Sequence, residues 1–199
     1  MQNPIVHEED VVPTPSQGAR LTYQDFLLFP DDGLRHEIID GEHYVTPSPN
    51  LRHQELVLRL GMSIELHIED RPERGRMFVA PFDVVFSFHD IVEPDVIFVA
   101  PDQLDILTAK NIQGTPAMVV EILSASTRKR DQEVKRKLYD LMGVREYWLV
   151  DPEQNFVSIC RRDAEGAFPL TTSLSAAGRD TLETPLLPGW SIELSRLFR

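Results

Sequence analysis

The stretch EPDVIFVAPDQLDILTAKNIQGTPAMVVEIL, residues 93–123, contains two strongly apolar runs, and each run carries one acid. Asp95 opens the run that continues VIFVA, and Glu121 lies near the end of AMVVEIL. Apolar runs of this length usually form strands that are buried in a sheet. An isolated buried charge costs many kcal/mol, so a carboxylate there must be neutralised, paired or bound to a cation. The two acids are therefore the first candidates for a functional site.

The composition predicts an ordinary globular domain. A chain of 199 residues can bury a sizeable core, and 42% hydrophobic and 26% charged residues are typical of globular proteins. The single cysteine, Cys160, excludes an intramolecular disulfide and agrees with a reducing compartment. The amino terminus has no signal-peptide pattern, and no stretch approaches the roughly 20 apolar residues that span a bilayer. We therefore expect a cytoplasmic protein with no membrane association.

The charge distribution argues against one class of function. A formal net charge of -12 is unfavourable for broad, non-specific adhesion to nucleic acid. Residues 128–137, RKRDQEVKRK, are an exception, because they hold six of the chain's 20 basic residues. This run is either a solvated helix face or a local basic site.

The first quarter of the domain carries clear local signals. Residues 1–19 are polar and predict a flexible tail before a domain of residues 20–199. A near capping box, Thr22-x-x-Asp25, predicts a short helix, and Asp40-Gly41 between two strand-like runs predicts a hairpin. Ser48-Pro49 predicts the start of an amphipathic helix over residues 49–69.

The remaining pattern alternates between strands and helices. Asp131 is the expected N-cap of the helix QEVKRKLYDLM, and Gly143 fits just past its end. Strand-like runs precede and follow this helix: FDVVFSF, DVIFVA, AMVVEIL, YWLVD, FVSICRR and FPLTTSL. The carboxyl terminus, SIELSRLF, predicts a strand and a short helix. Together these elements predict one α/β domain, with a central mixed sheet flanked by helices and no second core.

Two acids at strand ends suggest a metal site. Ligands collect at strand ends in α/β sheets, so Asp95 and Glu121 could converge on one divalent cation if their strands are neighbours. Mg²⁺ is typically held by one or two carboxylates together with waters and phosphate oxygens. Such an ion can activate water and stabilise charge on phosphorus, and a nearby lysine would support the attack.

The basic helix offers that lysine. Asp131, Lys135 and Tyr139 are four residues apart and share a helix face, whereas Lys137 lies about 200° around the helix from Lys135. The alternative is a surface ion pair between Asp131 and Lys135, which would contribute under about 1 kcal/mol. Glu37, in the first strand of the hairpin, is a further candidate, and its alternative is a solvated edge residue.

Other chemistries lack support. The six histidines have no metal-ligand spacing; His53 at the helix start could approach a site, although a surface or packing role is the simpler interpretation. Ser124, Ser126 and Thr127 are expected to be turn and capping residues, because no G-x-S-x-G elbow surrounds them. The sequence also has no glycine-rich phosphate loop and no dinucleotide fingerprint.

The order of motifs resembles one family. HEIIDGE, EPDVIFV, VVEILSASTRKRDQEVKRKLYDLMGVREYWLVDPE and LLPGW resemble, in this order, the Uma2 family. This bacterial group belongs to the PD-(D/E)XK nuclease superfamily and is labelled "putative restriction endonuclease". The resemblance covers about 180 residues, from LTYQDFLLFP to the end. It implies a restriction-endonuclease-like fold, with a core sheet of four or five mixed strands flanked by helices.

The resemblance also assigns roles to residues. The family's PD aspartate falls on Asp95 and its second acid on Glu121, which implies a Mg²⁺ or Mn²⁺ ion held by these two on adjacent strands. The usual E-x-K lysine would fall on Leu123, and the family's helix lysine maps instead onto Lys135. Glu37 matches the amino-terminal acid of many such nucleases. The resemblance therefore implies a catalytic set of four residues: Glu37, Asp95, Glu121 and Lys135.

The expected activity is metal-dependent hydrolysis of phosphodiester bonds in DNA by a metal-activated water. A structure-specific nuclease for RNA or branched DNA would differ only in its substrate. The rival hypothesis is a catalytically inactive protein that keeps the nuclease fold for binding or assembly. The acidic balance of the chain and the missing E-x-K lysine favour it. Relatives of this kind are often dimeric, so the resemblance also suggests a homodimer.

Overall fold

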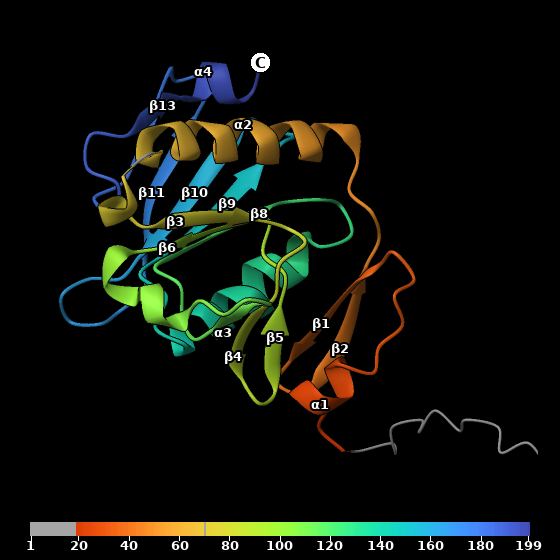
Figure 1. Cartoon of the computed structure of the whole chain (residues 1–199). Coiled ribbons are helices and arrows are strands. Elements are labelled where there is room, and N and C mark those ends of the chain that lie inside the picture. The colour runs from red at the N-terminus through yellow and green to blue at the C-terminus, as the bar shows by residue number, and fades with distance from the viewer. Residues whose placement is uncertain (1–18, 70) are drawn as a thin grey trace, which may run out of the picture.

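A six-stranded mixed sheet forms the centre of the computed structural model, which describes residues 19–69 and 71–199 (Figure 1). Its strand order is β11-β10-β9-β8-β6-β3, with β8 and β9 parallel and all other neighbours antiparallel. The strands are β3 (Arg76–Val79), β6 (Val96–Val99), β8 (Met118–Ile122), β9 (Glu146–Asp151), β10 (Phe156–Arg161) and β11 (Leu170–Ser175). The predicted α/β class with a mixed central sheet is confirmed, and the sheet has more strands than the four or five expected.

A second sheet lies below the first in Figure 1 and was not expected from the sequence. Its order is β2-β1-β5-β4-β7. Asp40 and Gly41 have φ of 52° and 77°, as a two-residue type I′ turn requires, so the predicted hairpin is confirmed. The strands are β1 (Arg35–Ile39), β2 (Glu42–Thr46), β4 (Val84–Ser87), β5 (Asp90–Val92) and β7 (Ile112–Gln113); β12 (Thr181–Glu183) and β13 (Ser191–Glu193) form a separate pair.

Two of the helices, α1 and α2, begin where side chains satisfy their free N–H groups. The capping box of Thr22 and Asp25 is present at α1 (Tyr23–Phe26). The long helix α2 (Leu51–Ile68) starts later than predicted, because Asn50 and not Ser48 is the cap; Asn50 Oδ1 accepts the His53 N–H at 2.9 Å. The chain ends with α4 (Leu194–Leu197). No helix within the described ranges is both long and apolar enough to cross a bilayer.

The helix after β8 corrects the predicted cap. Asp131 lies inside a π-helical segment, Arg130–Lys135, which continues into α3 (Arg136–Leu141). Its side chain is buried, while the Ser124 hydroxyl accepts the Thr127 N–H and Thr127 accepts the Asp131 N–H through its carbonyl. Ser124 therefore caps this turn in place of Asp131. Gly143, with φ of 81°, follows the helix as predicted.

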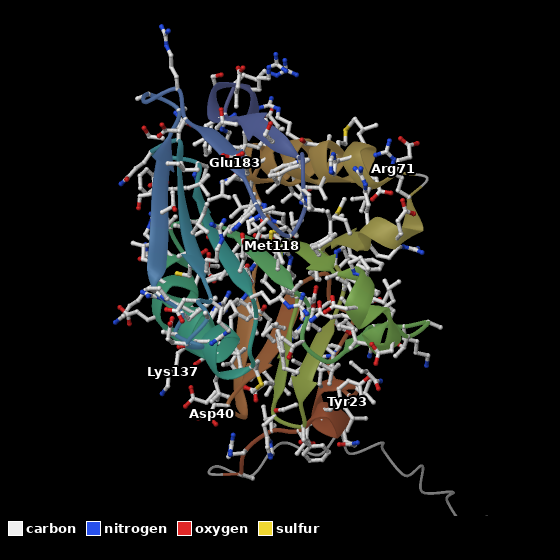
Figure 2. The ribbon with its side chains drawn as sticks, turned by 90° about the vertical axis from the view of Figure 1, so that its left-hand side faces the viewer. Tyr23, Asp40, Arg71, Met118, Lys137 and Glu183 are labelled. Atoms are coloured by element: carbon white, nitrogen blue, oxygen red, sulfur yellow. The ribbon has the colours of Figure 1, made fainter. Side chains whose placement is uncertain are left out.

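Two apolar layers enclose the central sheet, where the sequence indicated one core. Helix α2 and the carboxyl-terminal elements cover one face, and α3 with the second sheet covers the other (Figure 1). Figure 2 shows Met118 of β8 in the middle of the molecule, with Lys137 at its periphery. The strands are thus buried on both faces, which explains why their sequences are continuously apolar. In the first layer, Leu56, Leu60 and Ile64 of α2 lie with Phe98, Met118 and Trp148 of the central sheet. In the second layer, Tyr139 and Val92 lie with Val119 and Tyr147 of the central sheet.

The segment Glu93-Pro94-Asp95 links the two sheets, since β5 ends at Val92 and β6 begins at Val96. The Glu93 carboxyl group is largely buried, and burial raises its pKa to about 7, with the nearby Asp83 and Glu37 carboxylates adding to the shift. This link sets the start of β6 and with it the position of Asp95.

A substitution at Gly75, which precedes β3, tests how closely the edge of the central sheet is packed. Its φ is +101°, and an added Cβ would lie 2.4 Å from the Val99 carbonyl oxygen and 2.8 Å from the Phe98 ring. We expect Gly75→Ala to lower the free energy of unfolding by about 2 to 5 kcal/mol. Gly33→Ala is the matched control, because Gly33 also has positive φ, +76°, but nothing within 4 Å of the added Cβ. Its cost should be about 1 kcal/mol in urea unfolding, and equal costs would contradict the packing argument.

The raised pKa of Glu93 predicts that the stability of the fold depends on pH. A carboxyl pKa raised to about 7 in the folded state means that its contribution to stability is fully present below about pH 4.5 and is lost as the pH rises through 7. Glu93→Gln should therefore gain stability over the parent chain at about pH 8, by on the order of 2 kcal/mol, and gain little at about pH 5. Urea unfolding at both pH values measures this difference, with the exposed Glu65→Gln as control. A gain that is larger at the lower pH would refute the assignment.

Candidate active site

The two acids of the opening stretch face each other across adjacent strands. In the antiparallel pair β6 and β8, Val96 lies opposite Val120, so Asp95 and Glu121 are the next facing positions. Both are buried, with 2% and 4% of their surface exposed. Alternation along the strands places them on the face that carries Ile97 and Val119, toward α3 and the second sheet.

Asp95 is held by donors from three elements. Its Oδ1 accepts a hydrogen bond from Arg35 Nη1 on β1 at 2.7 Å. Its Oδ2 accepts the Ile122 N–H of β8 at 2.8 Å and lies 3.0 Å from His53 Nε2 on α2. Burial alone would raise the pKa of Asp95, but the hydrogen bonds and charges of His53 and Arg35 outweigh it and lower the pKa below its usual range. Asp95 is thus ionised at neutral pH.

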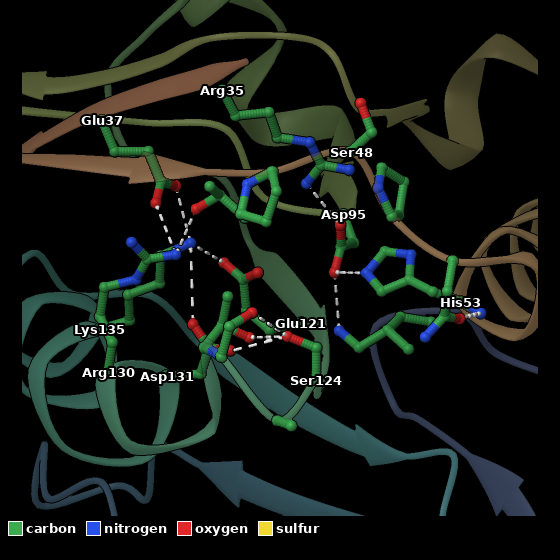
Figure 3. Close-up of a pocket in the computed structure, with 18 residues that line it drawn as sticks. Arg35, Glu37, Ser48, His53, Asp95, Glu121, Ser124, Arg130, Asp131 and Lys135 are labelled. Atoms are coloured by element: carbon green, nitrogen blue, oxygen red, sulfur yellow. Dashed lines mark hydrogen bonds and ion pairs between the residues drawn. The ribbon is translucent and has the colours of Figure 1, made fainter.

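Glu121 shares its environment with a buried lysine. Its Oε1 accepts hydrogen bonds from Lys135 Nζ and from the Tyr139 hydroxyl, both at 2.8 Å. Lys135 Nζ also lies 2.7 Å from Glu37 Oε1 and 4.0 Å from Asp131 Oδ1. The ammonium group therefore sits among three carboxylates from β1, β8 and the π-helical segment (Figure 3).

In this cluster the pKa values of Lys135 and Glu121 are both raised, but for different reasons. Burial would lower the pKa of Lys135, but the charges of Glu121, Glu37 and Asp131 outweigh it and raise the pKa, so Lys135 stays protonated. Burial raises the pKa of Glu121 to about 8; Lys135 opposes this shift, and the Asp131, Asp95 and Glu37 carboxylates add to it. Two facing carboxylates therefore differ in their charge near neutral pH.

The remaining acid of the cluster, Asp131, has an incomplete set of partners. Its Oδ1 is buried and accepts no hydrogen bond within the part of the chain that the structure describes. The same is true of Glu37 Oε2. Burial raises the pKa of Asp131, which Lys135 partly offsets. Arg130 Nη2 donates to Thr46 Oγ1 at 2.5 Å and lies 3.5 Å from Glu37 Oε2.

These side chains line one pocket of about 280 Å³. Figure 3 shows carboxylates and cationic groups pointing toward its centre from both sheets and from the helices. The rim is formed by the 46–50 connection before α2 and by the hydroxyl-rich turn at 124–127. The lining includes the predicted residues Glu37, Asp95, Glu121 and Lys135 and, in addition, Arg35, His53, Arg130 and Asp131.

Two interpretations from the sequence are corrected here. Lys135 and Asp131 do not form a surface ion pair, since each is only 2% exposed. Glu37 is not a solvated edge residue, because β1 lies between β2 and β5 and the residue is only 1% exposed. The two lysines of the basic run 128–137 have different environments: Lys135 is buried in the pocket, and Lys137 is exposed.

Two residues of the pocket, Arg35 and Arg130, were missed by sequence reasoning, and a third, His53, was considered but not chosen. Arg35 lies two positions before Glu37, so strand alternation alone places both side chains on the same face. Arg130 was hidden in the basic run. His53, which was expected to be a packing residue, contacts Asp95 because the Asn50 cap sets the first turn of α2 against the pocket.

The donor set fits a hard divalent cation. Carboxylate oxygens are the ligands that Mg²⁺ and Mn²⁺ prefer, and Glu37 and Asp131 each have a buried oxygen without a hydrogen bond in the described residues. Glu121 Oε2 likewise accepts no hydrogen bond from them, whereas both oxygens of Asp95 already have donors. Within residues 19–69 and 71–199, no three His, Cys, Asp or Glu side chains form a preassembled metal-binding group.

Comparisons with known proteins agree with this fold. A crystal structure of a putative nuclease belonging to DUF820 from Anabaena variabilis superposes with a TM-score of 0.72 over 89% of this chain and 97% of that chain. The two sequences are 18% identical, so the likeness concerns the fold. The search of curated proteins found no significant match. The family model Uma2, described as "Putative restriction endonuclease", matches residues 23–195, which is most of the chain, and the protein therefore belongs to the Uma2 family.

Proposed function

We propose that this protein is a Mg²⁺- or Mn²⁺-dependent endonuclease that hydrolyses phosphodiester bonds in DNA. The observation that carries the proposal is the burial of Lys135 against Glu37 and Glu121 in the same pocket as Asp95. The family description supports a nuclease. A cytoplasmic location and a homodimeric state stay predictions.

Asp95 and Glu121 would hold the ion, with water and phosphate oxygens completing its coordination. When bound, the ion supplies a positive charge at the phosphate and lowers the pKa of a coordinated water. His53 and the Ile122 N–H orient Asp95 for this role. Tyr139, whose pKa is raised by burial, stays protonated and fixes Glu121 Oε1 through its hydroxyl.

Lys135 would stabilise the negative charge that develops on phosphorus during the attack. Its ammonium group is fully protonated and is held in place from two sides by Glu37 and Glu121. Glu37 is itself fixed, since its Oε1 accepts the Glu93 N–H at 3.0 Å. Glu37 thus positions the lysine and has a second oxygen directed at Arg130.

The rival function is a catalytically inactive protein that uses the nuclease fold for binding or assembly. Its main support was the leucine at position 123, where the superfamily usually has lysine. Leu123 is buried in the apolar layer under α3, and the ammonium reaches Glu121 from the helix instead. The site therefore has the charge that the E-x-K lysine would supply, which favours the enzyme.

The first prediction from this proposal concerns metal-linked stability. Mg²⁺ or Mn²⁺ that binds only the native state should stabilise it by about 2.7 kcal/mol at a hundredfold excess over Kd, or several degrees in Tm. Asp95→Asn and Glu121→Gln should both remove most of this gain. Scanning fluorimetry with millimolar metal measures it, and Glu65→Gln, on the exposed face of α2, is the control. An unchanged Tm of the parent chain would count against the metal site.

The same variants should differ without metal. Asp95 is ionised and has three donors, so Asp95→Asn should lower the metal-free Tm. Glu121 has a raised pKa of about 8, so Glu121→Gln at about pH 7 replaces a largely neutral group and should change the Tm little. If Asp95 and Glu121 were unpaired and repelled each other, Asp95→Asn would remove the repulsion and raise the metal-free Tm. The donors around Asp95 reverse this expectation.

The second prediction tests the activity directly. Purified protein with Mg²⁺ or Mn²⁺ should cleave at least one of single-stranded, duplex and branched DNA. Lys135→Met should lower kcat by roughly a hundred- to a thousandfold with a smaller effect on KM. Lys137→Met, the exposed matched control, should weaken DNA binding severalfold at most, in a salt-dependent way.

Lys135→Met also removes the partner of buried carboxylates, so it should cost about 3 to 5 kcal/mol of stability. Circular dichroism and urea unfolding must therefore establish a temperature at which the variant is folded before its turnover is compared. Equal losses of turnover from the two lysine substitutions would eliminate the special role of Lys135.

A further inference from the structure

Arg35 faces the pocket with unused hydrogen-bond donors. It lies on β1 two residues before Glu37, and its Nη1 donates to Asp95 Oδ1 at 2.7 Å. Its Nε and Nη2 groups have no partner among the residues that the structure describes. The side chain is 18% exposed and lines the pocket (Figure 3). A guanidinium group in this position can bind a second anion through a planar pair of N–H groups.

Arg35 competes with a cation for Asp95, because its guanidinium group donates to Oδ1 and carries a charge of the same sign as the cation. The Ile122 N–H is fixed in β8, and His53 is held at the start of α2 with 9% of its side chain exposed. Arg35 is the more exposed of the two side-chain donors and has the longer, more flexible side chain. It is therefore the donor that Asp95 releases at the lowest cost.

A guanidinium group that leaves Asp95 needs a new anionic partner within the pocket. A phosphate group matches its fork with two parallel, charge-assisted hydrogen bonds. The charge of the pocket agrees: four carboxylates, Glu37, Asp95, Glu121 and Asp131, face three permanent cations, Arg35, Arg130 and Lys135. Arg130 and Lys135 add positive charge beside Arg35, and a bound divalent cation would offset the nearby carboxylates.

We propose that Arg35 exchanges between two anions: it pairs with Asp95 in the free protein and with the phosphodiester of DNA when Asp95 holds a divalent cation. This inference rests on the proposed function. Metal and DNA each favour the arrangement in which Arg35 has left Asp95, so each raises the affinity for the other. Arg35 is thus both an internal competitor of the metal and a ligand of the substrate.

The test measures binding of each partner separately from cleavage. Mn²⁺ affinity is measured by electron paramagnetic resonance, and DNA affinity by fluorescence anisotropy with Ca²⁺ and a labelled phosphorothioate duplex that resists hydrolysis. The variants are Arg35→Gln and Arg35→Lys. Arg145→Gln is the matched control, because it removes the same charge from an exposed ion pair with Asp102 outside the pocket.

The exchange predicts opposite effects on the two affinities. Arg35→Gln should bind Mn²⁺ severalfold more tightly than the parent chain and should bind DNA about tenfold more weakly. Arg35→Lys keeps the competing charge but not the fork, so its Mn²⁺ affinity should be close to that of the parent chain and its DNA affinity reduced. A Mn²⁺ affinity of Arg35→Gln that is unchanged or lower overturns the exchange. Tighter Mn²⁺ binding with unchanged DNA affinity overturns the transfer to phosphate.

The parent chain provides a test that needs no variant, should Arg35→Gln fail to fold. Its Mn²⁺ affinity should rise when the phosphorothioate duplex is present, and an unchanged affinity overturns the exchange. Coupled binding without cleavage of ordinary DNA would refute the proposed function and leave the exchange supported. Cleavage without coupling would refute the exchange alone.

Discussion

The position of the Lys135 ammonium group among Glu37, Glu121 and Asp131 is the interaction on which the rest of the site depends. It joins β1 of the second sheet, β8 of the central sheet and the π-helical segment in one buried cluster. Desolvating so many charges is costly, and apolar side chains of similar volume would often stabilise a fold more. Buried ionic groups of this kind are therefore better explained by the chemistry that they provide than by the stability that they contribute.

The antiparallel register of β6 and β8 produces two facing carboxylates with unlike properties. Asp95 lies where α2, β1 and the backbone of β8 all supply donors, and its pKa falls. Glu121 lies beside three other acids and one lysine, and burial raises its pKa. Environments that separate the pKa values of paired acids are typical of sites at which the two groups have different tasks.

The leucine at position 123, where the resemblance to PD-(D/E)XK nucleases implies a lysine, has a structural explanation. Position 123 packs in the apolar layer between the central sheet and α3, and the leucine there is 3% exposed. The helix that follows approaches Glu121 closely enough for both Lys135 and Tyr139 to contact one carboxylate oxygen. The π-helical segment, a geometry that is common at functional sites, directs Asp131 and Lys135 to the same side.

Local patterns in the sequence determined much of the secondary structure. The apolar runs predicted the central strands, Asp40-Gly41 the hairpin, and the capping box of Thr22 the first helix, because each depends on neighbours within a few residues. The same patterns marked Asp95 and Glu121, since an acid in an apolar run is visible without any knowledge of the fold. Lys135 was separated from Lys137 by helical spacing alone, and the family resemblance then selected it.

Only the tertiary structure decided which polar groups are buried and what they contact. The second sheet joins the predicted hairpin of β1 and β2 and the predicted strand β4 to the short strands β5 and β7, and these pairings bring together segments far apart in the chain. Its packing turns Glu37 from an apparent edge residue into a buried one. Arg35, His53 and Arg130 reach the pocket through contacts between elements that are far apart in the chain. The pairing of Asp95 with Arg35 spans 60 residues, and no local pattern encodes a contact whose partners meet only after both sheets have formed.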